Sequence, residues 1–374
     1  MSRWLNTPLT EALGCRYPIV QTAMGWVADA NLVIATTQAG GFGFLAGATI
    51  PADELEGEIR KVIDATGGSN FGLNFHMFQD NAAQCVDLAI QYRLRAVSYG
   101  RGPDKQTIAR FKAAKVLCIP TVGALKHALK AVELGADLIT IQGGEGGGHT
   151  GGVPSSILLP QVLAAVNVPV IAAGGYATGR GLASVLAAGA SGIAMGTRFL
   201  MTRESPTPRA TLERYLKVAD PQHVRVTTAV DGMRHRMIEN RFINELERAG
   251  PFGRLRIALG SAWQWKQQTG MSLAHMAGVF FRSLREDPSA LSQVVMAANQ
   301  PVLLQRSMVD GHPDEGILPS GQVAAAIDEL LSCRQVIEGI ADEAEQCLDA
   351  LLARCQPTAE PCQPHHPASI GEPL

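Results

Sequence analysis

The first 200 residues alternate between short apolar runs and segments with helical periodicity. Eight short runs are bounded by Gly or Pro, and most of them are continuously apolar, which is typical of buried parallel strands rather than half-exposed ones. The predicted strands are 18–24, 42–47, 71–76, 96–100, 116–122, 138–143, 168–175 and 192–200. Between them, segments such as 53–66, 124–135 and 179–189 carry apolar residues at helical spacing.

Eight strand–helix units in about 200 residues predict a (β/α)8 barrel, the TIM-barrel fold. A doubly wound open sheet is the alternative, because it has the same alternation of strands and helices. Glycine-rich or polar motifs follow successive strands, and only a closed barrel brings all such positions to one face. The count of eight and this convergence favour the barrel.

After Leu200 the pattern changes to helical stretches at 210–219, 239–250 and 288–300. We interpret residues 205–315 as a smaller, mostly helical substrate or lid domain over the barrel mouth. The segment 321–354 is amphipathic, forms one long helix or two, and returns to the barrel. The barrel domain therefore comprises 1–204 and 316–355, and the Pro-rich tail 356–374 is predicted to be disordered.

Composition narrows the class of protein. Hydrophobic residues make up 46% of the chain and charged residues 18%, as in a globular enzyme. A net charge of −2 and 5% aromatic residues argue against nucleic acid as a partner. No stretch predicts a membrane span or a secretory signal. We therefore expect a cytoplasmic protein that acts on a small molecule, with oligomerisation possible.

The seven cysteines are odd in number and scattered, which indicates reduced thiols. They lie at 15, 85, 118, 333, 347, 355 and 362, and the first three are interpreted as core residues. No metal site is indicated, since His365 and His366 in the tail are too isolated.

Two glycine turns follow the seventh and eighth predicted strands. They are Gly174-Gly175 and Gly196-Thr197, where (β/α)8 barrels often bind phosphate. Glycines let backbone N–H groups approach an anion, although they also serve tight turns with no ligand. Neither a dinucleotide fingerprint after the first strand nor a P-loop is present.

Other strand ends offer groups suited to a flat heterocycle. Ala23, Met24 and Gly25 are small or apolar positions, whereas Asn74 and Gln142 bring amides that both donate and accept hydrogen bonds. Together with one phosphate site, this mixture is typical of a flavin pocket.

The segment 142–152 reads QGGEGGGHTGG, and His149 is the candidate catalytic residue. Gly147 and Gly148, which precede it, are candidate cofactor-binding residues, and they leave room for a ligand and little apolar surface to bury the ring. Histidine exchanges a proton near neutral pH and so suits acid–base catalysis. His127 and His275 are interpreted as surface or satisfied histidines.

Several residues are secondary candidates. His76 ends the third strand and faces the mouth, where it contacts substrate or packs beside Asn74. Glu145 is either solvated or bound to N–H groups of its own loop, and Lys126 either steadies an anionic cofactor or starts a helix. The basic cluster 233–237, with Arg234, His235 and Arg236, is either a charged surface turn or a site for a CoA phosphate. Gln322 is a further candidate substrate contact.

These motifs together resemble the nitronate monooxygenase (2-nitropropane dioxygenase-like) family of FMN-dependent barrels, across about 350 residues. The matching segments are QTAMGWV, GGFGFLAG, GLNFH, QGGEGGGHTG, PVIAAGGYATGRGLASVLAAGASGIAMGTRF and GILPSGQVAAAID. The resemblance implies FMN at the carboxyl-terminal face of the barrel and His149 near its reactive edge. It also implies a ring contacted by Ala23, Met24, Asn74 and Gln142, and a phosphate held by Gly174, Gly175, Gly196 and Thr197.

A second set of phrases, MGWVADANLV, VDGMRH, MAANQPVLL and MVDG, is similar to flavin-dependent dehydrogenases of bicyclic CoA thioesters in bacterial steroid breakdown. Two functions are therefore expected from one flavin cradle. The first is oxidation of nitronates or nitroalkanes with O2, with His149 as acid or base. The alternative is NAD(P)H-linked chemistry at a C=C bond of an acyl-CoA, and a non-catalytic phosphate-binding barrel is the third possibility.

Overall fold

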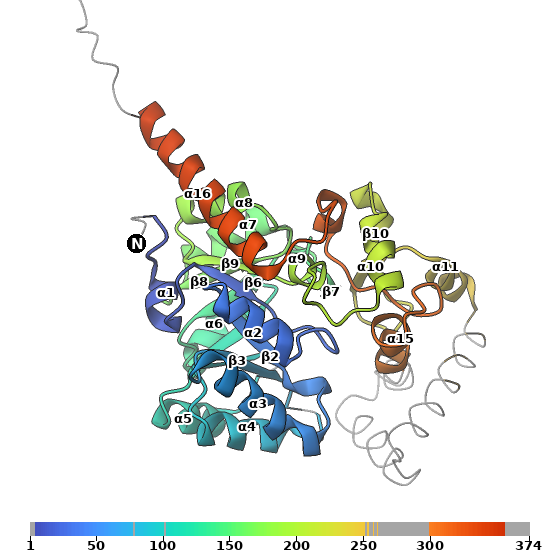
Figure 1. Cartoon of the computed structure of the whole chain (residues 1–374), viewed down its shortest axis with the longest axis horizontal. Coiled ribbons are helices and arrows are strands. Elements are labelled where there is room, and N and C mark those ends of the chain that lie inside the picture. Colours follow the sequence, from blue (N-terminus) through green and yellow to red (C-terminus); the bar gives the residue numbers. More distant parts are fainter. Residues whose placement is uncertain are drawn as a thin grey trace, which may run out of the picture.

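The computed structural model describes residues 4–250 except 78 and 101, together with 253, 257, 260 and 299–355. Eight parallel strands close into a barrel in the order β1-β2-β3-β4-β5-β6-β8-β9 (Figure 1). They are β1 Ile19–Gln21, β2 Phe42–Ala46, β3 Gly72–Phe75, β4 Ala96–Tyr99, β5 Leu117–Val122, β6 Ile139–Gln142, β8 Val170–Ala173 and β9 Gly192–Met195. Each lies within its predicted range, so the predicted (β/α)8 barrel is confirmed.

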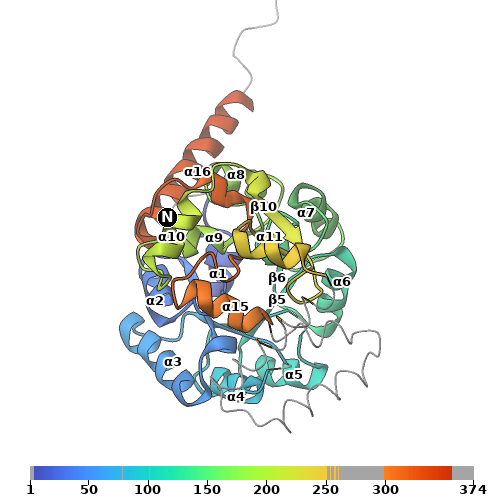
Figure 2. The ribbon, with the colours of Figure 1, turned by 90° about the vertical axis from the view of Figure 1, so that its right-hand side faces the viewer.

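Helices surround the strands, as Figure 2 shows. They are α2 Ala30–Gln38, α3 Ala52–Thr66, α4 Ala82–Gln91, α5 Lys105–Ala113, α6 Leu125–Leu134, α7 Ser155–Leu163 and α8 Gly179–Ala187, and a 3₁₀ turn η1, Gly47–Thr49, precedes α3. Inside the barrel, Phe42, Phe44 and Ile171 form one apolar cluster with Leu9 and Leu13. The last two come from α1, Pro8–Leu13, which thus closes the end of the barrel at which the strands begin.

One predicted element is wrong in detail, and one alternative left open by the sequence is decided. The run 192–200 is not one strand, because β9 ends at Met195 and Thr197–Leu200 form the short helix α9. Both halves are buried, and continuous burial hides the change of backbone period from the sequence. The segment 321–354 is not one continuous helix: Gln322–Ala326 form a 3₁₀ turn, η4, and α16 begins only at Cys333 and ends at Cys355. Between them, Leu331 forms a β-bridge with Thr202.

The segment after the barrel contains helices α10 Arg209–Leu216, α11 Arg241–Arg248 and α15 Asn299–Met308, with a 3₁₀ turn η2, Pro221–His223. These elements lie over the end of the barrel at which the strands terminate (Figures 1 and 2). The predicted helix 288–300 falls outside the described residues except for its last two, which begin α15, and the tail 356–374 also falls outside them.

This segment also contains a β-hairpin that was not predicted. Strands β10, Val224–Thr227, and β11, His235–Ile238, pair antiparallel, and β11 pairs in turn with β7, Gly148–His149. The three-stranded sheet β10-β11-β7 thus joins the loop after β6 to the segment over the barrel.

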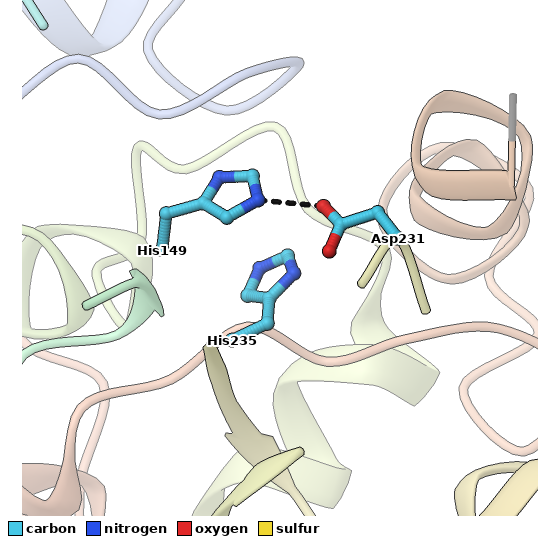
Figure 3. Close-up of side chains that lie close together, drawn as sticks. All are labelled: His149, Asp231 and His235. Carbon is cyan, nitrogen blue, oxygen red and sulfur yellow. Dashed lines mark hydrogen bonds and ion pairs between the residues drawn. The ribbon is translucent and has the colours of Figure 1, made fainter. Parts of the chain in front are cut away.

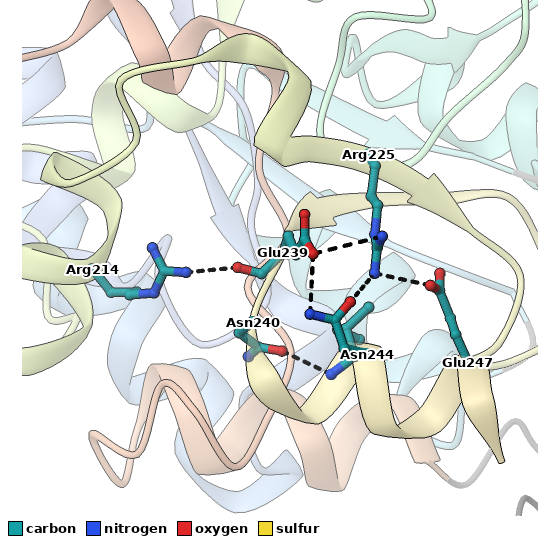
Figure 4. Close-up of polar contacts among 7 residues, drawn as sticks. Arg214, Arg225, Glu239, Asn240, Asn244 and Glu247 are labelled. Atoms are coloured by element: carbon teal, nitrogen blue, oxygen red, sulfur yellow. Dashed lines mark hydrogen bonds and ion pairs between the residues drawn. The ribbon is translucent and has the colours of Figure 1, made fainter.

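Polar contacts attach the hairpin to α11 (Figure 4). The Arg225 guanidinium forms ion pairs with Glu239 at 3.7 Å and Glu247 at 2.9 Å, and it donates to the Asn244 side chain. Asn244 Nδ2 donates to Glu239 Oε1 at 3.0 Å, and the Asn240 side chain caps α11 by accepting from the Ile243 N–H at 2.8 Å. These contacts keep the hairpin in place beside the barrel loops.

The helix α16 packs against α8 and α2, and its carboxyl-terminal part extends beyond the barrel (Figure 1). No described helix combines the length and the apolar character needed to cross a membrane. Cys15, Cys85 and Cys118 are buried, as predicted for core residues. Burial raises the pKa of the Cys85 thiol to about 12 and that of the Cys118 thiol to about 11, which keeps both protonated.

Candidate active site

The glycine-rich loop 142–152 is folded into the sheet and is not a linker. In the β7–β11 pair, His149 lies opposite His235 and Gly148 opposite Arg236. At the end of β6, Gln142 Nε2 donates to the carbonyl oxygens of Gly147 at 3.2 Å and His149 at 3.1 Å. The loop backbone is thereby held on both sides, and it fixes the position of the His149 side chain.

His149 is paired with a buried carboxylate, Asp231, in the turn between β10 and β11 (Figure 3). Its Nε2 lies 2.6 Å from Asp231 Oδ2, and the exposed fractions of the two side chains are 39% and 1%. The other carboxylate oxygen, Oδ1, accepts from the Met233 N–H at 2.9 Å. One half-exposed imidazole therefore contacts a carboxylate whose two oxygens are both engaged.

A second histidine stacks on the first. The rings of His149 and His235 are 4.5 Å apart between centroids and inclined by 21°. His235 is only 1% exposed, and its Nδ1 has no hydrogen-bond partner in the described part of the chain. The stacked pair, with Asp231, forms what we call the histidine cluster: His149, Asp231 and His235.

Burial and charge set the ionisation of this cluster. Burial alone would raise the pKa of Asp231, but the hydrogen bond and the charge of His149 outweigh it, so the net pKa is lowered. For His235, burial and the nearby charge of His149 lower the pKa to about 4, although Asp231 opposes the change. At neutral pH the cluster thus contains an ionised Asp231 and a neutral His235.

The three side chains offer ligand atoms within 4.8 Å of one another, which is a spacing that also suits a metal ion. A metal ion must lie near the plane of each imidazole that binds it, because the nitrogen lone pair lies in that plane. Two stacked rings inclined by only 21° have no shared point at bonding distance in both planes. The geometry favours an acid–base assembly over a metal centre.

The predicted phosphate residues meet at the ends of β8 and β9. Gly174 adopts φ +98°, and a Cβ there would lie 2.9 Å from the Gly143 carbonyl oxygen. A Cβ on Gly196 would lie 3.1 Å from Thr22 Oγ1 and 3.5 Å from Met24 Sδ, so the loop after β1 adjoins the end of β9. Thr197 is buried, and its hydroxyl accepts from the Gly321 N–H at 2.9 Å.

The predicted ring contacts line the same end of the barrel. Ala23, Met24 and Gly25 are half-buried directly after β1. Asn74 lies near the end of β3 with its Nδ2 donating to the Ser98 carbonyl at 3.0 Å. The NH2 groups of Asn74 and Gln142 donate to backbone oxygens, and no hydrogen bond to their side-chain oxygens is found within the described part of the chain.

Two of the secondary candidates are structural residues. Glu145 accepts from the Ser155 N–H at 3.1 Å through its carboxylate and so helps to start α7. Arg236 donates to the carbonyl oxygens of Gly144 and Val224, both at 2.8 Å. These contacts tie loops together rather than leave charge for a ligand.

The segment 320–322 connects two of these loops. The Gln322 N–H donates to the Glu145 carbonyl oxygen at 3.0 Å, and a Cβ on Gly147 would lie 2.5 Å from the Ser320 carbonyl carbon. Only glycine at position 147 permits this close approach of two backbones. Gln322 is half-buried beside the mouth, where its side chain stays a candidate substrate contact.

The remaining candidates lie around the mouth. His76 follows β3 and is half-buried, with its N–H donating to Gln79 Oε1 at 3.0 Å. Lys126 is exposed in the first turn of α6. Arg234 is exposed and lines a cavity of about 390 Å³ with Thr227, Thr228 and Glu247. The cluster 233–237 is therefore not a surface turn, because most of it forms β11 with His235 buried.

Asp231 is the site residue that sequence reasoning missed. It lies within VDGMRH, a phrase that the sequence offered only as a sign of relationship. The local pattern, an Asp four residues before His235, suggests that histidine rather than His149 as the partner of the carboxylate. The long-range pairing of β11 with β7, which brings Asp231 to His149, has no local sequence signal.

Comparison with known proteins identifies the family. The model of the family described as nitronate monooxygenase matches residues 6–89 and 78–343. The chain belongs to the nitronate monooxygenase family. Individual relatives differ in how much of the chain they match.

A protein from Rhodococcus jostii is 44% identical over 93% of this chain and 98% of its own length. Its name is (3aS,4S,5R,7aS)-5-hydroxy-7a-methyl-1-oxo-octahydro-1H-indene-4-carboxyl-CoA dehydrogenase. A probable nitronate monooxygenase from Staphylococcus haemolyticus is 28% identical over 65% of this chain and 81% of its own length. Among solved structures, FabK from Thermotoga maritima superposes with a TM-score of 0.76 at 28% identity and covers 93% of this chain and 99% of its own.

These relatives carry the names of oxidoreductases, and the family assignment places this chain in the same class. The protein is an enzyme, an oxidoreductase with a (β/α)8 barrel. The alternative of a non-catalytic barrel is therefore set aside.

Proposed function

We propose that the protein is an FMN-dependent oxidoreductase that removes hydrogen from two adjacent carbons of an acyl-CoA thioester and so forms a C=C bond. The observation that carries this proposal is the extent of the likeness. The acyl-CoA dehydrogenase relative matches 93% of the chain at 44% identity, whereas the nitronate monooxygenase relative matches 65% at 28%. This reverses the order of the two functions expected from the sequence, because the longer match leaves little room for a different substrate segment.

The residues at the carboxyl ends of the strands fit FMN. The positive φ of Gly174 (+98°) and Gly175 (+85°) turns the backbone sharply where a phosphate is expected in this fold. Half-buried Ala23 and Met24, and the amide oxygens of Asn74 and Gln142, suit the faces and the edge of the ring. When bound, FMN supplies the acceptor for the two electrons of the dehydrogenation.

The chain itself supplies the acid–base step. Dehydrogenation removes a proton from the carbon next to the thioester carbonyl and a hydride from the adjacent carbon. His149 is the group placed to take the proton, since it is half-exposed at the mouth while Asp231 is buried behind it. The carboxylate then stabilises the imidazolium that forms. NAD(P)+ is the proposed final electron acceptor.

Nitronate oxidation is the second candidate, and the match to the nitronate monooxygenase family model supports it. A nitroalkane loses a proton from the carbon bearing the nitro group, which is the same task for His149. With O2 as the electron acceptor, no nicotinamide would be needed.

The test begins with the purified protein, which should be yellow with bound FMN. Flavin that has been reduced without oxygen is expected to reoxidise slowly when O2 is admitted. In the opposite direction, NADH or NADPH should bleach the oxidised flavin rapidly. A bicyclic acyl-CoA should also bleach it, whereas a nitronate should not. Bleaching by nitronate alone would establish the second candidate, and a colourless protein that binds no FMN would refute both.

A further inference from the structure

We propose that Asp231 and His235, both on the β10–β11 hairpin, are positioning residues that make Nδ1 of His149 the nitrogen that exchanges the proton. The catalytic part of this inference rests on the proposed function. The structural part, which concerns the tautomer of His149, does not depend on it.

The first step is the hydrogen bond to Asp231. An ionised carboxylate only accepts hydrogen bonds, so His149 Nε2, at 2.6 Å from Oδ2, must carry the hydrogen. Asp231 cannot swing away easily, because Oδ1 accepts from the Met233 N–H at 2.9 Å. A neutral His149 therefore carries its lone pair on Nδ1.

The second step is the stack with His235. The antiparallel register places the two residues directly opposite each other, and their rings lie 4.5 Å apart. This contact restricts rotation of the half-exposed His149 ring. His235 is buried and neutral, so it provides a surface for packing without a second positive charge beside an imidazolium.

The polarity is opposite to that of the Ser-His-Asp triad, in which the carboxylate holds Nδ1–H and Nε2 takes the proton. Here the carboxylate holds Nε2–H. The other charged groups nearby are Glu145 in the same loop, which is bonded to Ser155, and Arg236 and Arg234 on the hairpin side. Among the described residues, the carboxylate of Asp231 is the ionic partner of His149.

Nitrogen NMR of the FMN-loaded enzyme, labelled with ¹⁵N-histidine, tests the tautomer directly. The chain has nine histidines, and the His149 signals are assigned from the His149→Ala spectrum. We expect Nε2–H for His149 in the wild type and loss of that preference in Asp231→Asn. Asp231→Glu, which keeps the charge, should restore it in part. A wild-type signal of the Nδ1–H form would overturn the proposal.

Kinetics provide the second readout. Asp231→Asn is expected to lower kcat by about 10²- to 10⁴-fold with little change in KM, by analogy with the loss of a triad carboxylate. Glu239→Gln is the matched control. It removes a carboxylate that follows directly after β11 and that pairs with Arg225 instead of His149. Wild-type kcat in Asp231→Asn would overturn the positioning role.

For His235 the stack predicts an order of kcat: wild type above His235→Phe, and His235→Phe above His235→Ala, since only Phe keeps a ring against His149. Equal kcat for Phe and Ala would exclude the stacking role. If wild-type enzyme turned over neither acyl-CoA nor nitronate, the proposed function would fail, while the NMR result would still decide the tautomer.

Discussion

His149 and His235 face each other across two short strands, β7 and β11, with their rings stacked 4.5 Å apart. One strand belongs to a barrel loop and the other to the hairpin that lies over the barrel. The candidate catalytic residue is thus held from two parts of the chain at once. A change in the hairpin should therefore alter chemistry at the barrel mouth even where no substrate contact is lost.

The first prediction concerns His149 itself. His149→Ala should bind FMN normally, because the ring is not part of the Gly174 and Gly196 turns, and should lose about 10²- to 10⁴-fold in kcat. Visible absorption gives the flavin content, and steady-state assays give kcat. His127→Ala, at an exposed position on α6, is the control and should match the wild type. Near-normal turnover of His149→Ala would contradict the assignment.

The second prediction is a dependence of stability on pH through His235. The folded protein keeps His235 neutral down to its lowered pKa of about 4, whereas the unfolded chain protonates it near the ordinary value of 6.5. Between these values the unfolded state binds more protons, so stability is full above pH 6.5 and falls as pH falls toward 4. The two pKa values differ by an amount worth on the order of 3 kcal/mol.

His235→Phe removes this titration and keeps a ring in the stack. Its loss of Tm between pH 7 and pH 5, compared at equal flavin content, should therefore be smaller than that of the wild type by a few degrees. His223→Phe, which changes an exposed histidine just before β10, should keep the wild-type loss. An unchanged pH dependence in His235→Phe would show that the folded state does not exclude the proton from this ring.

The sequence was sufficient for the parts of the fold that repeat locally. Most of the eight barrel strands are largely apolar, and each lies inside its predicted range, because burial on both faces leaves a clear signal even in a short segment. The end of the last strand was misplaced, since Phe199 and Leu200 in α9 are as buried as β9 itself. Burial alone does not distinguish a buried strand from a buried turn of helix.

The site could be predicted only where local sequence determines it. His149 was predictable because glycines surround it within one loop. Asp231 and the burial of His235 were not, because both depend on β11 pairing with a two-residue strand far away in the chain. The segment that pairs is short and has a charged residue on each side of His235, Arg234 and Arg236, so it resembles an exposed turn in the sequence.

The third prediction tests the glycine turn at Gly174 as part of the proposed phosphate site. Gly174→Ala places a side chain at φ +98° with its Cβ 2.9 Å from the Gly143 carbonyl oxygen, so both strain and a backbone clash are expected. Stability should fall by about 1–3 kcal/mol, and flavin content should fall with it. Gly57→Ala, in the exposed middle of α3 with nothing within 4 Å, should raise stability by about 0.5–1 kcal/mol. Full flavin content in Gly174→Ala would contradict the proposed role of this turn in holding the FMN phosphate.

The fourth prediction separates the two proposed substrates. Arg234 is exposed and lines the cavity of about 390 Å³ beside the hairpin. Arg236, the other arginine of the cluster 233–237, donates to two carbonyl oxygens, so Arg234 is the arginine whose charge is available to a ligand. If it contacts a CoA phosphate, Arg234→Gln should raise the KM for an acyl-CoA about 10-fold, the loss of roughly 1.4 kcal/mol, and leave kcat unchanged. The KM for a nitronate should not change, because that substrate lacks the phosphates. Arg209→Gln, on the exposed side of α10, is the control for loss of a positive charge. An equal rise for both substrates would place Arg234 at the shared reaction centre, and no rise for either would place the CoA phosphates elsewhere.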